Sequence, residues 1–237
     1  MFLLLSIAIA AAPPSACAQA AGEAKLKALK ARAIALYQAG KYSEAIQLAE
    51  RYAAAMKTRH GENAPEYATA INNLALFLQA TNRLAEAEKL FRRALAIDEA
   101  SYGPDHPNVA YDLNNLAELL RATNRLAEAE PLFRRALAIW EKSLGAEHPN
   151  VATTLNNLAQ LLRATNRLAE TEQLYRRALI IDEASYGPNH PNVATTLNNL
   201  AGLFRTTNRL AEAETLFRRA LAIWEKSLGA EHPNVAS

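Results

Sequence analysis

The stretch PNVATTLNNLAQLLRATNRLAETEQLYRRALIIDEASYGPNH, residues 149–190, is one complete unit of a repeat that runs along the chain. The dipeptide His-Pro returns at equal intervals, beginning at 106, 148, 190 and 232, and TNRLAE begins at Thr81, Thr123, Thr165 and Thr207 in the same steps. A repeat of this length is typical of a solenoid, in which each unit buries its apolar face against its neighbours. The period therefore predicts a stack of similar units rather than a single globular core.

Each unit contains two helical patterns joined by a turn. In the quoted unit, Pro149 suits the first turn of a helix, and Leu155 and Leu158 lie on one side of it at helical spacing. Asn166 tolerates the left-handed conformation that ends a helix, and the second pattern stops near the breaker pair Gly187-Pro188. Because Ala, Leu, Glu and Arg dominate the chain and favour helices, the predicted fold class is all-α.

The first unit diverges from the others, because GKYSEA at 40–45 stands where the next unit has NRLAEA at 82–87. The equal steps give five helix-turn-helix repeats and the beginning of a sixth. The predicted boundaries are 1–20 for a signal peptide, 21–64 for the divergent first repeat, 65–106, 107–148, 149–190 and 191–232 for repeats 2 to 5, and 233–237 for the start of a truncated sixth repeat.

A series of small, large and small apolar residues marks the second helix of most units. Ala87, Phe91 and Ala94 follow Asn82 in the turn, and the series returns in later units. The returning residues are Ala129, Phe133 and Ala136, and then Ala213, Phe217 and Ala220. The series resembles the tetratricopeptide repeat, and LNNLA, LFRRALAI and HPNVA together resemble its kinesin-light-chain-type subfamily. Over residues 24–237 the resemblance implies a right-handed α-solenoid whose first helices line a concave groove.

Several residues depart from this pattern, beginning with Ala49 and Tyr52 of the first unit, which stand where the later units have Phe and Ala. Thr171 replaces the small Ala of the second helix in repeat 4. Pro131 falls one turn into its helix in repeat 3, where the missing N–H and the ring should kink the helix or delay its start.

A longer period, equal to two units, overlies the shorter one. Asp98 and Asp182 alternate with Trp140 and Trp224 at the same place in the unit, where the tryptophans are expected to be packing or rim residues. The segments 98–152 and 182–236 differ at seven positions, which in the first segment are 105, 111, 112, 118, 120, 122 and 131. Five of the seven lie on the first helix, so the exposed side of that helix either drifted or was retuned.

Two adjacent asparagines stand in the first helix of each later unit, although Asn is a poor helix former. By the resemblance they form a ladder in the groove: Asn72 and Asn73, Asn114 and Asn115, Asn156 and Asn157, Asn198 and Asn199. An amide both donates and accepts, so it can pair with the backbone of an extended peptide. The alternative is that one Asn of each pair bonds a neighbouring repeat and holds the superhelix together.

Arginines recur near the end of the same helices. Arg121, Arg163 and Arg205, with Gln79 at the equivalent earlier place, form a cationic row suited to carboxylates. We therefore predict a peptide-binding groove that favours an acidic segment of a protein partner.

Other site classes find little support in the sequence. The recurring histidines (His106, His148, His190 and His232) lie a whole repeat apart in linkers, so they are not expected to share a metal ion. Glu88 precedes Arg92 by four residues, as in later units, so the arginine pairs are expected to be compensated rather than to bind nucleic acid. The net charge of +2 agrees with this. No nucleophile-base pair, phosphate loop or carboxylate dyad stands out, so we predict no enzyme, cofactor or metal.

The first twenty residues differ in kind from the rest. An apolar stretch from Phe2 to Ala12 is too short to span a bilayer, and the small residues after it are typical of a cleavable export signal. The chain is therefore predicted to be exported, to the periplasm or outside the cell. Lipid anchoring through Cys17 is the less favoured alternative, because Pro14 stands where a lipobox has Leu.

Three functions remain open at this point. The favoured one is a non-enzymatic scaffold that binds a peptide segment of a partner in the groove. The second is the recognition arm of a larger enzyme or signalling protein, such as a caspase-like peptidase, whose catalytic part is absent. The third is self-association through an uncapped C-terminal repeat near Ser237.

Overall fold

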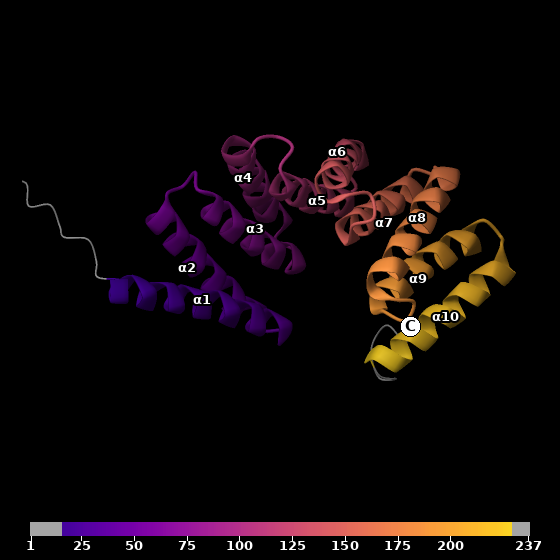
Figure 1. Cartoon of the computed structure of the whole chain (residues 1–237), viewed down its shortest axis with the longest axis horizontal. Helices are drawn as coiled ribbons and strands as arrows, with labels where there is room; N and C mark the ends of the chain where they lie inside the picture. Colours follow the sequence, from indigo (N-terminus) through magenta and orange to yellow (C-terminus); the bar gives the residue numbers. More distant parts are fainter. Residues whose placement is uncertain (1–15, 229–237) are drawn as a thin grey trace, which may run out of the picture.

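The computed structural model describes the backbone of residues 16–228 and the side chains of 22–227. These residues form ten α-helices without a strand, arranged as five helix-turn-helix pairs (Figure 1). The bounds are α1 Ala16–Gln38, α2 Tyr42–His60, α3 Pro65–Ala80, α4 Leu84–Tyr102, α5 Pro107–Ala122, α6 Leu126–Leu144, α7 Pro149–Ala164, α8 Leu168–Tyr186, α9 Pro191–Thr206 and α10 Leu210–Leu228. The all-α solenoid predicted from the period is therefore confirmed.

The three predictions that concern the chain ends lie largely outside the described residues. Residues 1–15 of the predicted signal peptide are not described, and α1 begins at Ala16, within the predicted segment. The side chain of Cys17, His232 and the start of the sixth repeat are also outside the description. Export, lipid anchoring and self-association accordingly stay predictions.

The first helices of repeats 2 to 5 (α3, α5, α7 and α9) begin where the sequence predicts. Pro65, Pro107, Pro149 and Pro191 each occupy the first helical position, where no N–H is needed. The linker histidines before the last three of these helices cap them. The backbone N–H of Asn150, for example, donates to Nδ1 of His148 at 3.1 Å, and His106 and His190 accept in the same way. The repeated histidine thus satisfies a backbone donor that the helix leaves unpaired.

The turns inside the repeats also follow the sequence. Asn82, Asn124, Asn166 and Asn208 adopt φ of 60–61°, the left-handed conformation, and Gly40 does the same in the first repeat with φ of 73°. Each of these residues ends the first helix of its pair and lets the chain reverse.

Pro131 does not delay the start of its helix, so that alternative was wrong. Helix α6 begins at Leu126, the place equivalent to Leu84 and Leu168. The backbone N–H of Ala129 still donates to the carbonyl of Arg125 at 3.1 Å, and Ala129 is fully buried. The turn before the helix and this buried contact set its start, while the proline removes only a bond on the exposed side.

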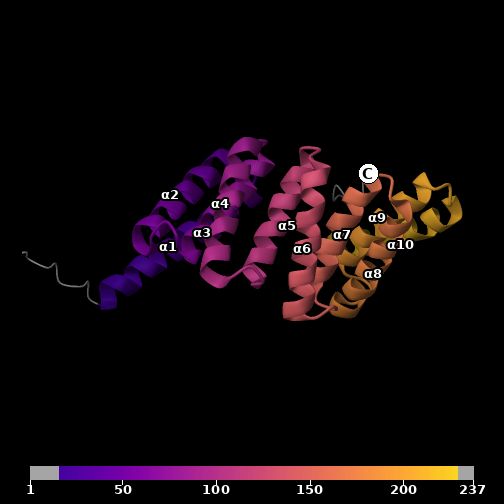
Figure 2. The same ribbon diagram turned by 90° about the horizontal axis from the view of Figure 1, so that it is seen from above.

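Each helix packs against its neighbours in sequence, so the chain forms an arch rather than a globule (Figures 1 and 2). In repeats 2 to 5, the first helices also contact one another directly, from α3 to α5, α5 to α7 and α7 to α9. Direct contacts between the second helices are far fewer. The first helices therefore lie closest together and form the inner side of the arch.

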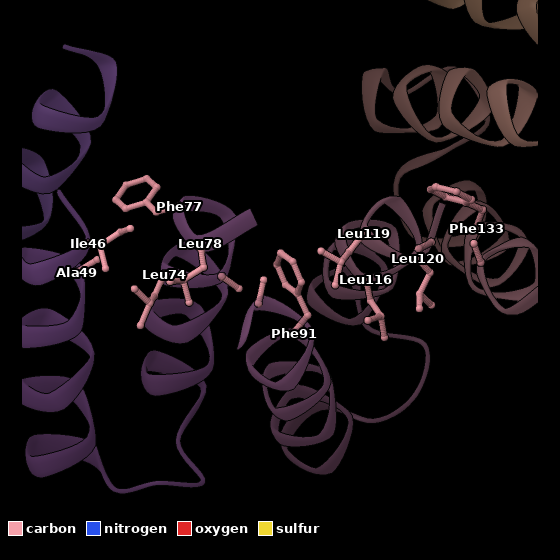
Figure 3. Close-up of a cluster of buried hydrophobic side chains, with 14 of the residues drawn as sticks. Ile46, Ala49, Leu74, Phe77, Leu78, Phe91, Leu116, Leu119, Leu120 and Phe133 are labelled. Atoms are coloured by element: carbon pink, nitrogen blue, oxygen red, sulfur yellow. The ribbon is translucent and has the colours of Figure 1, made fainter. Parts of the chain in front are cut away.

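The core is a continuous apolar layer between the two rows of helices. Phe91 of α4 lies between the leucines of α3 and those of α5, and it is fully buried (Figure 3). Phe133 repeats this place in α6, and Tyr175 repeats it in α8. Burial of each large apolar side chain contributes roughly 1.5–3 kcal/mol, which outweighs the helix penalty of the asparagines.

Ion pairs connect the second helices of successive repeats. The Arg125 guanidinium lies 2.7 Å from Glu88, which also pairs with Arg92 four residues later. The same arrangement joins Arg167 to Glu130 and Arg209 to Glu172. The prediction that the arginine pairs belong to a compensated face is confirmed.

Candidate functional site

The paired asparagines form a hydrogen-bonded ladder along the inner helices. The side-chain amide of Asn115 donates to Oδ1 of Asn72 at 3.2 Å, which joins α5 to α3. Asn157 donates to Asn114 at 3.3 Å and Asn199 to Asn156 at 3.5 Å in the following repeats. The second Asn of one repeat thus bonds the first Asn of the repeat before it, as the structural alternative expected.

The ladder leaves some hydrogen-bond donors and acceptors of the asparagine side chains unused. Each amide has two N–H donors and a carbonyl with two lone pairs, and a rung uses one donor of one Asn and one lone pair of the other. Asn72 is buried, whereas the other seven predicted asparagines are half-buried. Asn73 and Asn198 make no side-chain hydrogen bond within the described residues. The structural role and the predicted binding role are therefore compatible.

A central hollow opens beside the ladder. It has a volume of about 540 Å³ and an apolar floor in which the Tyr37 and Phe77 rings stack with centroids 4.5 Å apart. The residues around it are Tyr37, Leu76, Phe77, Gln79, Ala80, Asn114, Asn115, Glu118 and Asn157. An apolar floor between amide walls suits one side chain of an extended chain.

Two further hollows lie at equivalent places, separated by one step of the longer period. The N-terminal hollow, about 240 Å³, is lined by Lys30, Thr69, Asn72, Asn73, Asp98, Asn108, Tyr111 and Asp112. The C-terminal hollow, about 210 Å³, is lined by Thr153, Asn156, Asn157, Gln160, Asp182, Asn192, Thr195, Thr196 and Asn199. Between them, Trp140 takes the place of the Asp and packs into the core with α7, which explains why the hollows alternate.

The C-terminal hollow is internally satisfied. The Thr196 hydroxyl donates to Asp182 at 2.7 Å and accepts from the side-chain amide of Asn156 at 2.8 Å. Burial raises the pKa of Asp182, while the Thr196 hydroxyl and His190 act in the opposite direction.

The N-terminal hollow has the same frame with a different pairing. Asp112 stands where the other hollow has Thr196. The N-terminal hollow therefore holds two buried carboxyl groups, Asp98 and Asp112, and lacks the hydroxyl that Thr196 supplies in the other one. Oδ1 of Asp98 and Oδ2 of Asp112 have no hydrogen-bond partner among the described residues. Burial raises the pKa of Asp98 to about 6, and burial with the charges of Asp98 and Glu99 raises the pKa of Asp112 to about 8.

This acidic pair was not among the predicted site residues. The sequence held a signal, because position 112 was one of seven differences between the duplicated segments. What the sequence did not show is that α4 and α5 bring positions 98 and 112 to the same hollow.

The three predicted arginines differ in their surroundings. Arg121 is paired with Glu118 at 2.5 Å, so its charge is already compensated. Arg163 and Arg205 are exposed and make no ion pair among the described residues, because the positions equivalent to Glu118 are Gln160 and Gly202. Of the cationic row, Arg163 and Arg205 are therefore available to a partner's carboxylate, whereas Arg121 is already paired within the chain.

The described residues offer neither a metal cage nor a membrane span. Within residues 22–227, no three His, Cys, Asp or Glu side chains gather as a metal cage would require. None of the described helices combines the length and the apolar character needed to cross a membrane.

A family model described as tetratricopeptide repeat matches residues 66–142, 113–179 and 162–226, which together span more than half of the chain. No curated protein matches the chain. Among solved structures, a kinesin light chain-like protein of Podosopora anserina with nearly identical TPR-like repeats aligns with a TM-score of 0.71 and 24% identity, over 86% of this chain and 96% of that one.

Two other solved structures share the fold. BtubC (BKLC) from P. vanneervenii aligns with a TM-score of 0.74 and 22% identity, over 89% of this chain and 83% of that one. The apo form of RapI aligns with a TM-score of 0.70 and 17% identity, over 86% of this chain and 71% of that one. These identities support a common fold and no more.

Proposed function

The chain belongs to the tetratricopeptide repeat family, whose repeats typically mediate protein–protein contacts, and we propose that it is a non-enzymatic scaffold binding an extended peptide in its concave groove. The observation that carries the proposal is the amide ladder on the inner helices, which keeps spare donors and acceptors beside the hollows. Such groups recognise the backbone of a partner segment independently of its side chains.

The side-chain preference comes from the hollows and the open arginines. The central hollow, with Leu76 and Phe77 in its floor, accepts one apolar side chain. Arg163 and Arg205 favour a carboxylate further along the groove, because each can donate two parallel hydrogen bonds to it. The preferred segment thus carries an apolar residue followed or preceded by acidic ones, within a protein partner.

A selection from a random linear peptide library tests this proposal. The chain is the bait, and the affinity of each enriched peptide is then measured against the single variants Asn157→Ala and Asn199→Ala. We expect each substitution to weaken binding about three- to tenfold, because each removes an amide hydrogen-bonding group of about 1 kcal/mol. The double variant Arg163→Gln/Arg205→Gln should weaken only peptides that contain Asp or Glu.

The control lies on the opposite side of the stack. Ile180 of α8 is 67% exposed, and the equivalent place in α6 is Ala138. The variant Ile180→Ala should bind every selected peptide as the parent does. Melting curves monitored by circular dichroism separate loss of binding from loss of fold. Peptides that bind the parent and the asparagine variants equally, while all remain folded, would show that the ladder is structural only.

A further inference from the structure

Two of the residues that differ between the equivalent hollows both favour a cation in the N-terminal one. In the C-terminal hollow, Thr195 and Thr196 stand where the N-terminal hollow has Tyr111 and Asp112. The substitutions add a second carboxyl group and an aromatic ring to an otherwise conserved frame of amides and one Asp. Both additions favour a cation, the first by charge and the second by the negative face of its ring.

The carboxyl groups of the N-terminal hollow are buried and incompletely bonded. Asp98 is 4% exposed and Asp112 is 3% exposed, and one oxygen of each has no partner among the described residues. A buried carboxylate without a partner is costly, and an ion or donor that enters the hollow removes that cost. Their equivalents, Asp182 and Thr196, satisfy each other and leave no such demand.

We propose that the N-terminal hollow binds a cationic side chain, a lysine ammonium or an arginine guanidinium, of the segment that occupies the groove. The inference rests on the proposed function, since it names the chemistry of one residue of that segment. Asp98 and Asp112 accept hydrogen bonds from the cation, and Tyr111, which is 49% exposed, covers it from the groove side.

A divalent metal ion fits the hollow less well. Calcium takes six to eight oxygen ligands and usually several carboxylates, whereas the hollow offers two carboxyl groups and neutral amides. Lys30 also lines the hollow from α1, at the ladder position of the first repeat. It makes no ion pair with Asp98 or Asp112 among the described residues, and the charge of His106 acts on Asp98 alone, so no described cation is bonded to either carboxyl group.

The groove then has opposite charge preferences at its two ends. The N-terminal hollow with Asp98 and Asp112 takes a basic residue, and the region of Arg163 and Arg205 takes acidic ones. This arrangement fixes the direction in which a segment lies in the groove, which the amide ladder alone does not specify.

Titration of the full chain by nuclear magnetic resonance tests the inference. The probe is Nα-acetyl-lysine N-methylamide, and the control probe is the norleucine analogue, which has a similar shape without the charge. We expect saturable shifts of the backbone amides of Asp98, Tyr111 and Asp112 with the lysine probe only. A third arm with calcium chloride distinguishes a metal site.

Two variants exchange distinguishing side chains between the hollows. Asp112→Thr should weaken the lysine probe about tenfold or more, since it removes a carboxyl group that accepts hydrogen bonds from the cation. It should fold, because Thr occupies the equivalent buried place in α7 and α9. The double variant Thr195→Tyr/Thr196→Asp should create a second lysine-responsive region around Asp182.

Three results would overturn the inference: equal shifts with lysine and norleucine probes, an unchanged lysine response in Asp112→Thr, or a response to calcium alone. The outcome is independent of the peptide selection. If the hollow binds the lysine probe but no peptide is enriched, the proposed function fails and the cation site stands. If enriched peptides lack basic residues and the hollow stays silent, the function stands and the cation site fails.

Discussion

At the scale of single residues, position 112 shows how one side chain changes an interface that repetition otherwise copies. Ala70, Asp112, Thr154 and Thr196 occupy equivalent places in α3, α5, α7 and α9, and all four are buried. Ala and a hydrogen-bonded Thr are buried at little cost, whereas an ionised carboxylate is not. The protonation of Asp112 is therefore coupled to folding.

The variant Asp112→Asn should make the free energy of unfolding less dependent on pH. The folded pKa of about 8 lies above the unfolded value of about 3.9, so the folded state binds more protons between these values. Its stabilising effect is complete below pH 4 and is lost as the pH rises towards 8. We expect the variant to match the parent near pH 4 and to be more stable by roughly 1–3 kcal/mol at pH 8, in urea unfolding at both pH values.

Asp105→Asn is the matched control. Asp105 is exposed, and its hydrogen bond and ion pair with Lys142 lower its pKa, so removing its charge should bring no gain at pH 8. An Asp112→Asn variant that is no more stable than the parent at pH 8 would contradict the burial of an unsatisfied carboxyl group at this position.

Candidate site residues are easier to recognise in the sequence than the residues to which they form hydrogen bonds. The asparagine pairs, the linker histidines and the arginine row were visible as repeated letters. Local geometry explains the histidine cap, because it reaches a donor only two residues away. The bond from Asn157 to Asn114 spans 43 residues and depends on how successive repeats rotate, which no single helix pattern contains. Asp98 and Asp112 were missed for the same reason.

At the scale of elements, the helix ends were the most predictable feature. Pro149 begins α7, Asn166 follows its end with positive φ, and Gly187 follows α8 with φ of 83°. These residues act through their own backbone preferences, so a sequence reports them directly. Pro131 misled the prediction because its effect depends on neighbours: it lies on the exposed side of α6, and buried Ala129 holds the turn before it.

Helix α6 should still be weakened by this proline. Pro131 has no N–H for the carbonyl of Ala127, and the equivalent residue in α8 is Gln173, also exposed. We expect Pro131→Gln to raise the free energy of unfolding by about 1–3 kcal/mol, because it restores a helix bond and removes a ring clash. The measurement is chemical denaturation with circular dichroism.

The reciprocal variant Gln173→Pro supplies the comparison. It should lower the free energy of unfolding by a similar amount, since it introduces the same defect into α8. Equal stability of the parent and Pro131→Gln would mean that the helix has adapted fully to the proline.

At the scale of the whole molecule, the helix contacts within residues 16–228 run between helices of the same repeat or of adjacent repeats along the arch (Figure 1). A stack of this kind is stabilised repeat by repeat and interface by interface, in the manner of a one-dimensional chain. The shorter period, from His106 to His148, predicted this architecture, because it is a property of the whole sequence rather than of one segment. The longer period shows that the interfaces are of two kinds, polar at Asp98 and Asp182 and apolar at Trp140.

The apolar interface at Trp140 should couple the two halves of the stack. Trp140 of α6 is 5% exposed and belongs to one buried cluster with Val151 and Leu155 of α7. Replacing it with Ala leaves a cavity and removes about 3–5 kcal/mol of stabilisation at this interface. In a one-dimensional stack the halves can then unfold separately. Hydrogen exchange of Trp140→Ala should show α7–α10 losing protection at a lower denaturant concentration than α3–α4.

Trp224→Ala is the matched comparison, because it removes the same side chain from the last repeat. The two variants should differ in which helices lose protection. Trp224 lies in the cluster formed by α9 and α10, so the loss of protection should be confined to those helices. If instead every helix of the Trp140→Ala variant lost protection together, the stack would unfold as one cooperative unit. The ladder and the arginine–glutamate pairs, which also cross between repeats 3 and 4, would then be strong enough to couple the halves without the tryptophan.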